Sequence, residues 1–164
     1  MGRRQLELWI AGLVVLFDQV TKALVRNRLS LHDELELIPG LLNFTRVHNT
    51  GAAFGLLNAA DLPMKTLILG IVAAAALAGL AMYASTLPEE QRLTRVGLSF
   101  IIGGAAGNLI DRLVSGYVID FVDFYWRGWH FWAFNVADAA ITAGVTLMIL
   151  DLLGAKGSRV PRTI

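Results

Sequence analysis

The sequence contains no cysteine, which excludes disulfide bonds, thiolate nucleophiles and metal sites built from cysteine. It is also poor in charge, because 16% of its 164 residues are charged, against roughly 25% in a typical soluble domain. The net charge is only +1, so no strong basic field favours a nucleic-acid partner. Hydrophobic residues make up 55% of the chain, and the mean hydropathy is +0.59. These values predict an integral membrane protein with a single domain over residues 1–164.

Four apolar runs predict transmembrane helices at about residues 6–25, 64–84, 95–113 and 132–152. The first run follows Arg3 and Arg4, as in a signal peptide, but no small-residue cleavage site follows it. We therefore interpret it as a retained helix. The third run is rich in glycine, and the four-residue spacing of Gly103 and Gly107 would let another helix approach closely.

Two segments between the helices, at about residues 30–57 and 114–131, are expected on the outer side of the membrane. The first contains ELELI, a Pro39-Gly40 turn and then LLNFTRVH, which predicts a small hairpin or β-cradle on the outer face. The second is expected to be a periplasmic loop whose tyrosines and tryptophans suit a membrane interface. The predicted fold class is an all-α membrane protein with a small extracytoplasmic β-element.

An even number of spans puts both termini on one side of the membrane. That side carries Arg3, Arg4, Arg92, Arg95, Lys156, Arg159 and Arg162. The positive-inside rule predicts that it is cytoplasmic. The opposite side also carries basic residues, which weaken this bias: Arg26, Arg28, Arg46 and Lys65.

Two polar groups within the first and third helices have two readings each. Asp18 and Lys22 are four residues apart and share a helix face, either as a local ion pair or as part of a site. Asn108, Asp111 and Arg112 also cluster at one helix end, where they either support neighbouring loops or build a site. The spacing alone leaves both alternatives open.

Asp138 lies inside the fourth apolar run, three residues after Asn135. A carboxylate in hydrocarbon is costly, by roughly 2.5–3.5 kcal/mol on insertion scales, so both side chains should face the bundle interior. A purely structural role for Asp138 would require a cationic partner. The candidates are Lys22 and Arg112, which lie on other helices.

Asp120, in GYVIDF, is a second carboxylate expected at similar depth, and Asp123 competes with it for the same role. No H-E-x-x-H motif is present, and no helix carries a histidine that could activate Ser99. The histidines lie outside the predicted helices, at His32, His48 and His130. We therefore expect no metal or cofactor. What remains is a pair of carboxylates that share a proton, one activating water while the other polarises a carbonyl group.

Together these residues resemble the lipoprotein signal peptidase family, also called signal peptidase II. Five motifs in the family's order carry the resemblance over most of the chain. They are DQVTK (18–22), NTGAAFG (49–55), GGAAGNLIDR (103–112), VIDF (118–121) and FNVADAAIT (134–142).

The resemblance implies an aspartyl intramembrane protease of the bacterial inner membrane, with its active site near the outer leaflet. Its substrates would be prolipoproteins whose cysteine carries a diacylglyceryl group, cleaved just before that cysteine to release the signal peptide. Membrane lipid would surround the site, and globomycin-type peptides would inhibit it. The catalytic pair falls on Asp120 and Asp138. The positions that build or line the site fall on Asp18, Lys22, Asn49, Gly51, Asn108, Arg112 and Asn135.

Two other classes of function remain open from the residues alone. A component of a proton- or ion-coupled transporter would use Asp138 as a relay acid, although no inverted repeat is visible. A membrane scaffold protein would leave the polar residues of the helices without a purpose.

Overall fold

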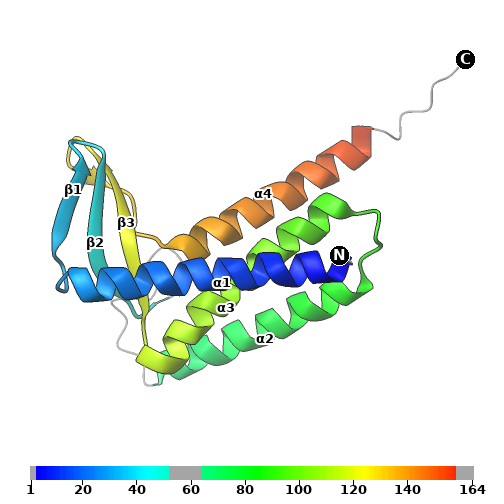
Figure 1. Cartoon of the computed structure of the whole chain (residues 1–164), viewed down its shortest axis with the longest axis horizontal. Helices are drawn as coiled ribbons and strands as arrows, with labels where there is room; N and C mark the ends of the chain where they lie inside the picture. Colours follow the sequence, from blue (N-terminus) through cyan, green and yellow to red (C-terminus); the bar gives the residue numbers. More distant parts are fainter. Residues whose placement is uncertain (1–2, 52–63, 158–164) are drawn as a thin grey trace, which may run out of the picture.

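The computed structural model describes residues 3–51 and 64–157. These residues form four helices that are long and apolar enough to cross a membrane, together with a small antiparallel sheet (Figure 1). This architecture confirms the predicted fold class. The helices are α1 (Arg3–Arg28), α2 (Lys65–Thr86), α3 (Arg92–Ser115) and α4 (Val136–Gly157).

Helix α3 is the centre of the bundle, because α1, α2 and α4 all pack against it. Its glycines allow this close approach: a Cβ atom at Gly103 would meet α1, and one at Gly104 would meet the backbone of Ala137 in α4. Gly97 of α3 and Gly144 of α4 likewise face each other's backbone. Small residues at helix contacts are the usual way in which membrane helices pack.

The outer faces of the helices are apolar. On α2, only Gly70 is buried, while large side chains such as Ile68, Ile71 and Val72 are exposed. Hydrocarbon is the environment that tolerates such a surface, so this is a multi-pass membrane protein.

The sheet stands at one end of the bundle, beside the end of α1 and the start of α4 (Figure 1). Its strands are antiparallel in the order β1-β2-β3-β4. They are β1 (Glu34–Ile38), β2 (Leu42–Asn49), β3 (Val118–Trp126) and β4 (Trp129–His130). The β1–β2 hairpin lies in the segment predicted to form a cradle; residues 52–57 of that segment lie outside the described residues.

The prediction of a loop at 114–131 was wrong. Most of this segment forms the long strand β3 and the short strand β4. Strand β3 completes the sheet by pairing with β2, with Asp120 opposite Val47. The many β-branched and aromatic residues in VIDFVDFYW favour this strand. Pairing between segments so distant in the chain is invisible to local pattern.

The start of the fourth helix is a second correction. It was expected near residue 132, but α4 begins at Val136. Phe134 instead forms a bridge to Val122, in which each residue's N–H donates to the other's carbonyl oxygen. The chain enters the helix only after this bridge, which places Asn135 immediately before the first turn.

We predict that Gly103→Ala lowers the free energy of unfolding by about 1–3 kcal/mol, the usual cost of overpacking. The added Cβ would lie 2.8 Å from the carbonyl oxygen of Ala11 and 2.8 Å from the Cβ atom of Val14. The matched control is Gly79→Ala on α2, where a Cβ meets nothing within 4 Å. Thermal unfolding in detergent should rank Gly103→Ala well below the control; equal stability would contradict the packing described.

Candidate active site

Asn135 and Asp138 form a reciprocal cap at the start of α4. The Asn135 side-chain oxygen accepts from the Asp138 N–H at 3.0 Å, and the Asp138 carboxylate accepts from the Asn135 N–H at 3.3 Å. This is the geometry of a capping box, in which side chains satisfy the free N–H groups of a first helical turn. Asp138 therefore lies at the end of its helix, where a negative charge is favoured by the helix dipole.

Asp120 lies in β3 and is 3% exposed. Its two carboxylate oxygens accept from the side-chain amides of Asn135 at 2.6 Å and Asn49 at 3.0 Å. Asn135 thus contacts both carboxyl groups, that of Asp120 through its amide and that of Asp138 through its backbone N–H. Sheet and helix bring the two acids to the same asparagine.

Lys22 of α1 is buried, and only 1% of its surface is exposed. Its ammonium group lies 2.8 Å from Asp18, 2.8 Å from Asp111 and 2.9 Å from the side-chain oxygen of Asn108. Three acceptors match the three N–H bonds of an ammonium group. The second oxygen of Asp18 accepts from the Ala137 N–H at 3.0 Å, so α1 also caps α4.

Lys22 determines how the Asn108 side chain is oriented. An ammonium group can only donate, so the Asn108 atom that faces it must be the oxygen. The amide N–H of Asn108 is then directed to Asp138, at 2.8 Å. A buried lysine on one helix thereby fixes a hydrogen-bond donor to an acid on another.

Arg112 connects this cluster to the end of β2. Its guanidinium group donates to the carbonyl oxygen of Gly51 at 2.9 Å and to that of Asn108 at 3.3 Å. The Gly51 N–H in turn donates to the side-chain oxygen of Asn49 at 2.9 Å. These contacts hold Asn49 where its amide meets Asp120; residues 52–55 of the same motif lie outside the described residues.

All nine site residues expected from the sequence therefore lie in one continuous set of contacts, which we call the polar network. Its members are Asp18, Lys22, Asn49, Gly51, Asn108, Arg112, Asp120, Asn135 and Asp138. The alternative acid, Asp123, is outside it, because its carboxylate lies 2.8 Å from the His130 ring on the β3–β4 hairpin. Asp123 is three positions after Asp120 in strand β3, and this odd step puts the two side chains on opposite faces.

The family model for signal peptidase (SPase) II matches residues 10–154 of this sequence. The chain belongs to the signal peptidase II family. The lipoprotein signal peptidase of Symbiobacterium thermophilum is 45% identical over 148 residues, covering 90% of this chain and 94% of the relative. That of Pseudomonas aeruginosa is 38% identical over 152 residues, covering 92% and 89%. A solved structure described as a bacterial membrane enzyme is 34% identical and superposes with a TM-score of 0.81 over 98% of this chain and 94% of that one.

Two further residues contact the polar network but were not expected as site residues of this signal peptidase II chain. Asp111 was noted only as part of a helix-end cluster, yet it is a direct partner of Lys22. Gln19 donates to Asp18 at 3.1 Å, to Asp111 at 3.1 Å and to the carbonyl oxygen of Gly107 at 3.2 Å. The spacing of Asp111 from Asn108, one helical turn, was a usable signal. Gln19 lies three residues before Lys22, so the same spacing was available for it.

The surroundings of Asp120 raise its pKa to about 7. Burial is the largest cause, and the neighbouring charge of Asp138 adds to it. Hydrogen bonds from Asn49 and Asn135 and the charge of Lys22 oppose the increase in pKa. A carboxyl group with this pKa is partly protonated at neutral pH, as a general acid requires. The carboxyl group of Asp138, by contrast, is only partly buried. Among the described residues, no group of three or more histidine, aspartate or glutamate side chains is placed to bind a metal ion.

We predict that Lys22→Met lowers the free energy of unfolding by about 3–5 kcal/mol, because it leaves the buried carboxylates of Asp18 and Asp111 without their cation. The double variant Lys22→Met/Asp111→Asn removes one of these charges and should recover part of the loss. Unfolding in detergent measures both. If the double variant were less stable than the single one, uncompensated charge would not be the cause.

A second prediction concerns pH. Peptidase activity should fall above about pH 7, as Asp120 loses its proton and the site loses its acid. Asn49→Ala removes a hydrogen bond that lowers the pKa of Asp120, so the alkaline limb should move to higher pH. Profiles of kcat against pH for wild type, Asn49→Ala and the control Asp123→Asn test this. An Asn49→Ala limb that is unchanged or moves to lower pH would count against it.

Proposed function

We propose that this chain is an aspartyl endopeptidase that removes the signal peptide from prolipoproteins. It cleaves the peptide bond just before a cysteine that carries a diacylglyceryl group. The observation that carries this proposal is the pair of acids joined through Asn135, one of them buried with a pKa of about 7. Membership of the signal peptidase II family supports the substrate class.

Within this pair, Asp138 acts as the base and Asp120 as the acid. Asp138 lies in the first turn of α4 and accepts hydrogen bonds from the Asn108 side chain and the Asn135 backbone N–H, and these contacts favour its charged form. Asp120 is buried beside that charge, which favours its protonated form. Two acids with different surroundings divide the roles of acid and base in this way.

The reaction follows from these roles. Asp138 takes a proton from water while the hydroxyl oxygen attacks the carbonyl carbon of the scissile bond, and Asp120 gives its proton to the carbonyl oxygen. Collapse of the tetrahedral diol then returns a proton to Asp120 and delivers one from Asp138 to the leaving nitrogen. The C–N bond breaks, and the pair regains its starting protonation state.

We further propose that the chain forms a single domain in the bacterial inner membrane, with both termini cytoplasmic and the two acids near the outer leaflet. The starts of α1 and α3 lie at the bundle end remote from the sheet (Figure 1), and they contain Arg4, Arg92 and Arg95, which supports this orientation by the positive-inside rule. The position of Asp138 in the first turn of α4 supports chemistry at interface depth. A lipid-modified substrate would then reach it laterally from the membrane, and globomycin-type peptides would compete for the same place.

The decisive experiment uses purified protein in detergent and a synthetic prolipoprotein peptide, with and without diacylglyceryl on its cysteine. Wild type should cleave only the lipidated peptide, directly before the cysteine, as measured by mass spectrometry. Asp120→Asn and Asp138→Asn should each lower the rate by about 10²–10⁴-fold, the usual contribution of a general acid or base. Asp123→Asn, a matched loss of one carboxylate on the same strand, should remain active.

Full activity in either Asn variant of the pair would overturn the roles assigned to these acids. Cleavage of both peptides at equal rates would support the endopeptidase activity but would show that the diacylglyceryl group is not required for substrate recognition. No cleavage by a folded wild type would reject the proposed function as a whole.

A further inference from the structure

A cavity of about 300 Å³ lies at the end of the bundle remote from the acids, between α1, α2 and α3. Its walls are mostly apolar and come from all three helices. They include Leu8 and Ala11 of α1, Ala81 and Ala84 of α2, and Leu98 and Ile102 of α3. None of these residues belongs to the polar network.

The cavity exists because α1 and α2 both pack on α3 but make few direct contacts with each other among the described residues. Alanine at positions 11, 81 and 84 leaves the space between them unfilled. From Arg4 to Ala11 the lining of α1 extends about 10 Å along the helix axis, at 1.5 Å per residue. The space is long and narrow, which suits part of an acyl chain.

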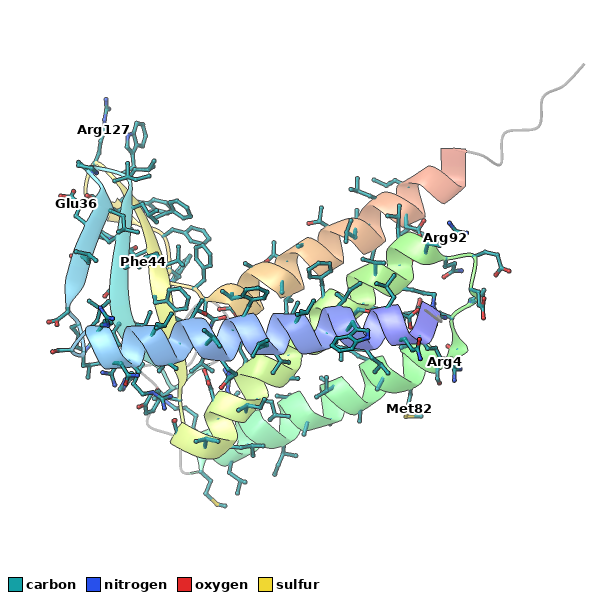
Figure 2. The ribbon with its side chains drawn as sticks, in the orientation of Figure 1. Arg4, Glu36, Phe44, Met82, Arg92 and Arg127 are labelled. Atoms are coloured by element: carbon teal, nitrogen blue, oxygen red, sulfur yellow. The ribbon has the colours of Figure 1, made fainter. Side chains whose placement is uncertain are left out.

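Among the residues that line the cavity, two arginines, Arg4 and Arg95, face one carboxylate, that of Glu7. Arg95 and Glu7 neutralise each other through two hydrogen bonds of 2.6 and 3.0 Å, and Arg95 also donates to the carbonyl oxygen of Leu87 at 2.6 Å. Arg4 lines the same cavity and has no ion-pair partner among the described residues. Figure 2 shows Arg4 at this end of the bundle, with Met82 nearby and the sheet at the far end.

We propose that this cavity binds one anionic glycerophospholipid of the surrounding leaflet. An acyl chain occupies the apolar space between α1 and α2, and the phosphate of the headgroup pairs with Arg4. Apolar walls below an uncompensated arginine at the membrane surface match both parts of such a lipid. The proposal does not depend on the peptidase activity, because no residue of the polar network takes part.

The bound lipid would supply contacts that the protein does not make for itself. Helix α2 buries only Gly70, and it meets the rest of the bundle chiefly through α3. A chain wedged between α1 and α2 would join them directly. The lipid therefore acts as a structural partner that holds α2 in the bundle.

The test is native mass spectrometry of the full chain in detergent, titrated with phosphatidylglycerol or phosphatidylcholine that have identical acyl chains. Wild type should bind one phosphatidylglycerol about fivefold more tightly than phosphatidylcholine, the preference expected from one arginine at a membrane surface. Arg4→Gln should remove this preference. The control Arg92→Gln removes one positive charge at the same end of the bundle, but residue 92 does not line the cavity. This variant should therefore keep the preference for phosphatidylglycerol.

A second pair of variants tests the acyl space. Ala84→Phe fills the cavity and should lower the affinity for the first phosphatidylglycerol several-fold, whereas Ala75→Phe, on the same helix but outside the cavity, should not. Equal binding of the two lipids by wild type, unchanged preference in Arg4→Gln, or equal effects of the two phenylalanine variants would each overturn the proposal.

Discussion

The ammonium group of Lys22 donates to Asp18, Asp111 and Asn108 where almost no water reaches it. Removing any one partner would leave a buried charge or dipole unsatisfied, so α1 and α3 are fixed relative to each other. Asp18 extends the constraint to α4 through the Ala137 N–H. One cation thus determines the relative positions of three helices, and the geometry of the acids follows from it.

At the start of α4, the side chain of Asn135 both caps the helix and contacts a candidate catalytic acid. Asn135 and Asp138 close the first turn of the helix as any capping pair does, yet the same asparagine donates to Asp120. A helix end needs acceptors for its free N–H groups, and a carboxylate near a membrane needs donors. Placing the acid at the helix start satisfies both needs, which explains how Asp138 is tolerated at the edge of an apolar span.

Residue spacing predicted which side chains share a helix face, and the family resemblance selected nine residues that the structure brings into one set of contacts. Asp18 with Lys22, and Asn135 with Asp138, followed from helical periodicity. Strand β3 did not, because its pairing with β2 joins segments about 70 residues apart in the chain. Asp120 therefore looked like a loop acid, although it is in a strand at the centre of the sheet. The late start of α4 depends on the Val122–Phe134 bridge, another non-local contact.

Helix α2 contributes no side chain to the polar network, which is drawn from α1, α3, α4, the sheet and the residues that follow β2. The hydrogen bonds that hold the two acids therefore do not involve the side chains of α2. The helix with the smallest buried share is thus not among the elements that hold the two carboxyl groups together, so the largest apolar outer surface and the polar network occupy different parts of the fold.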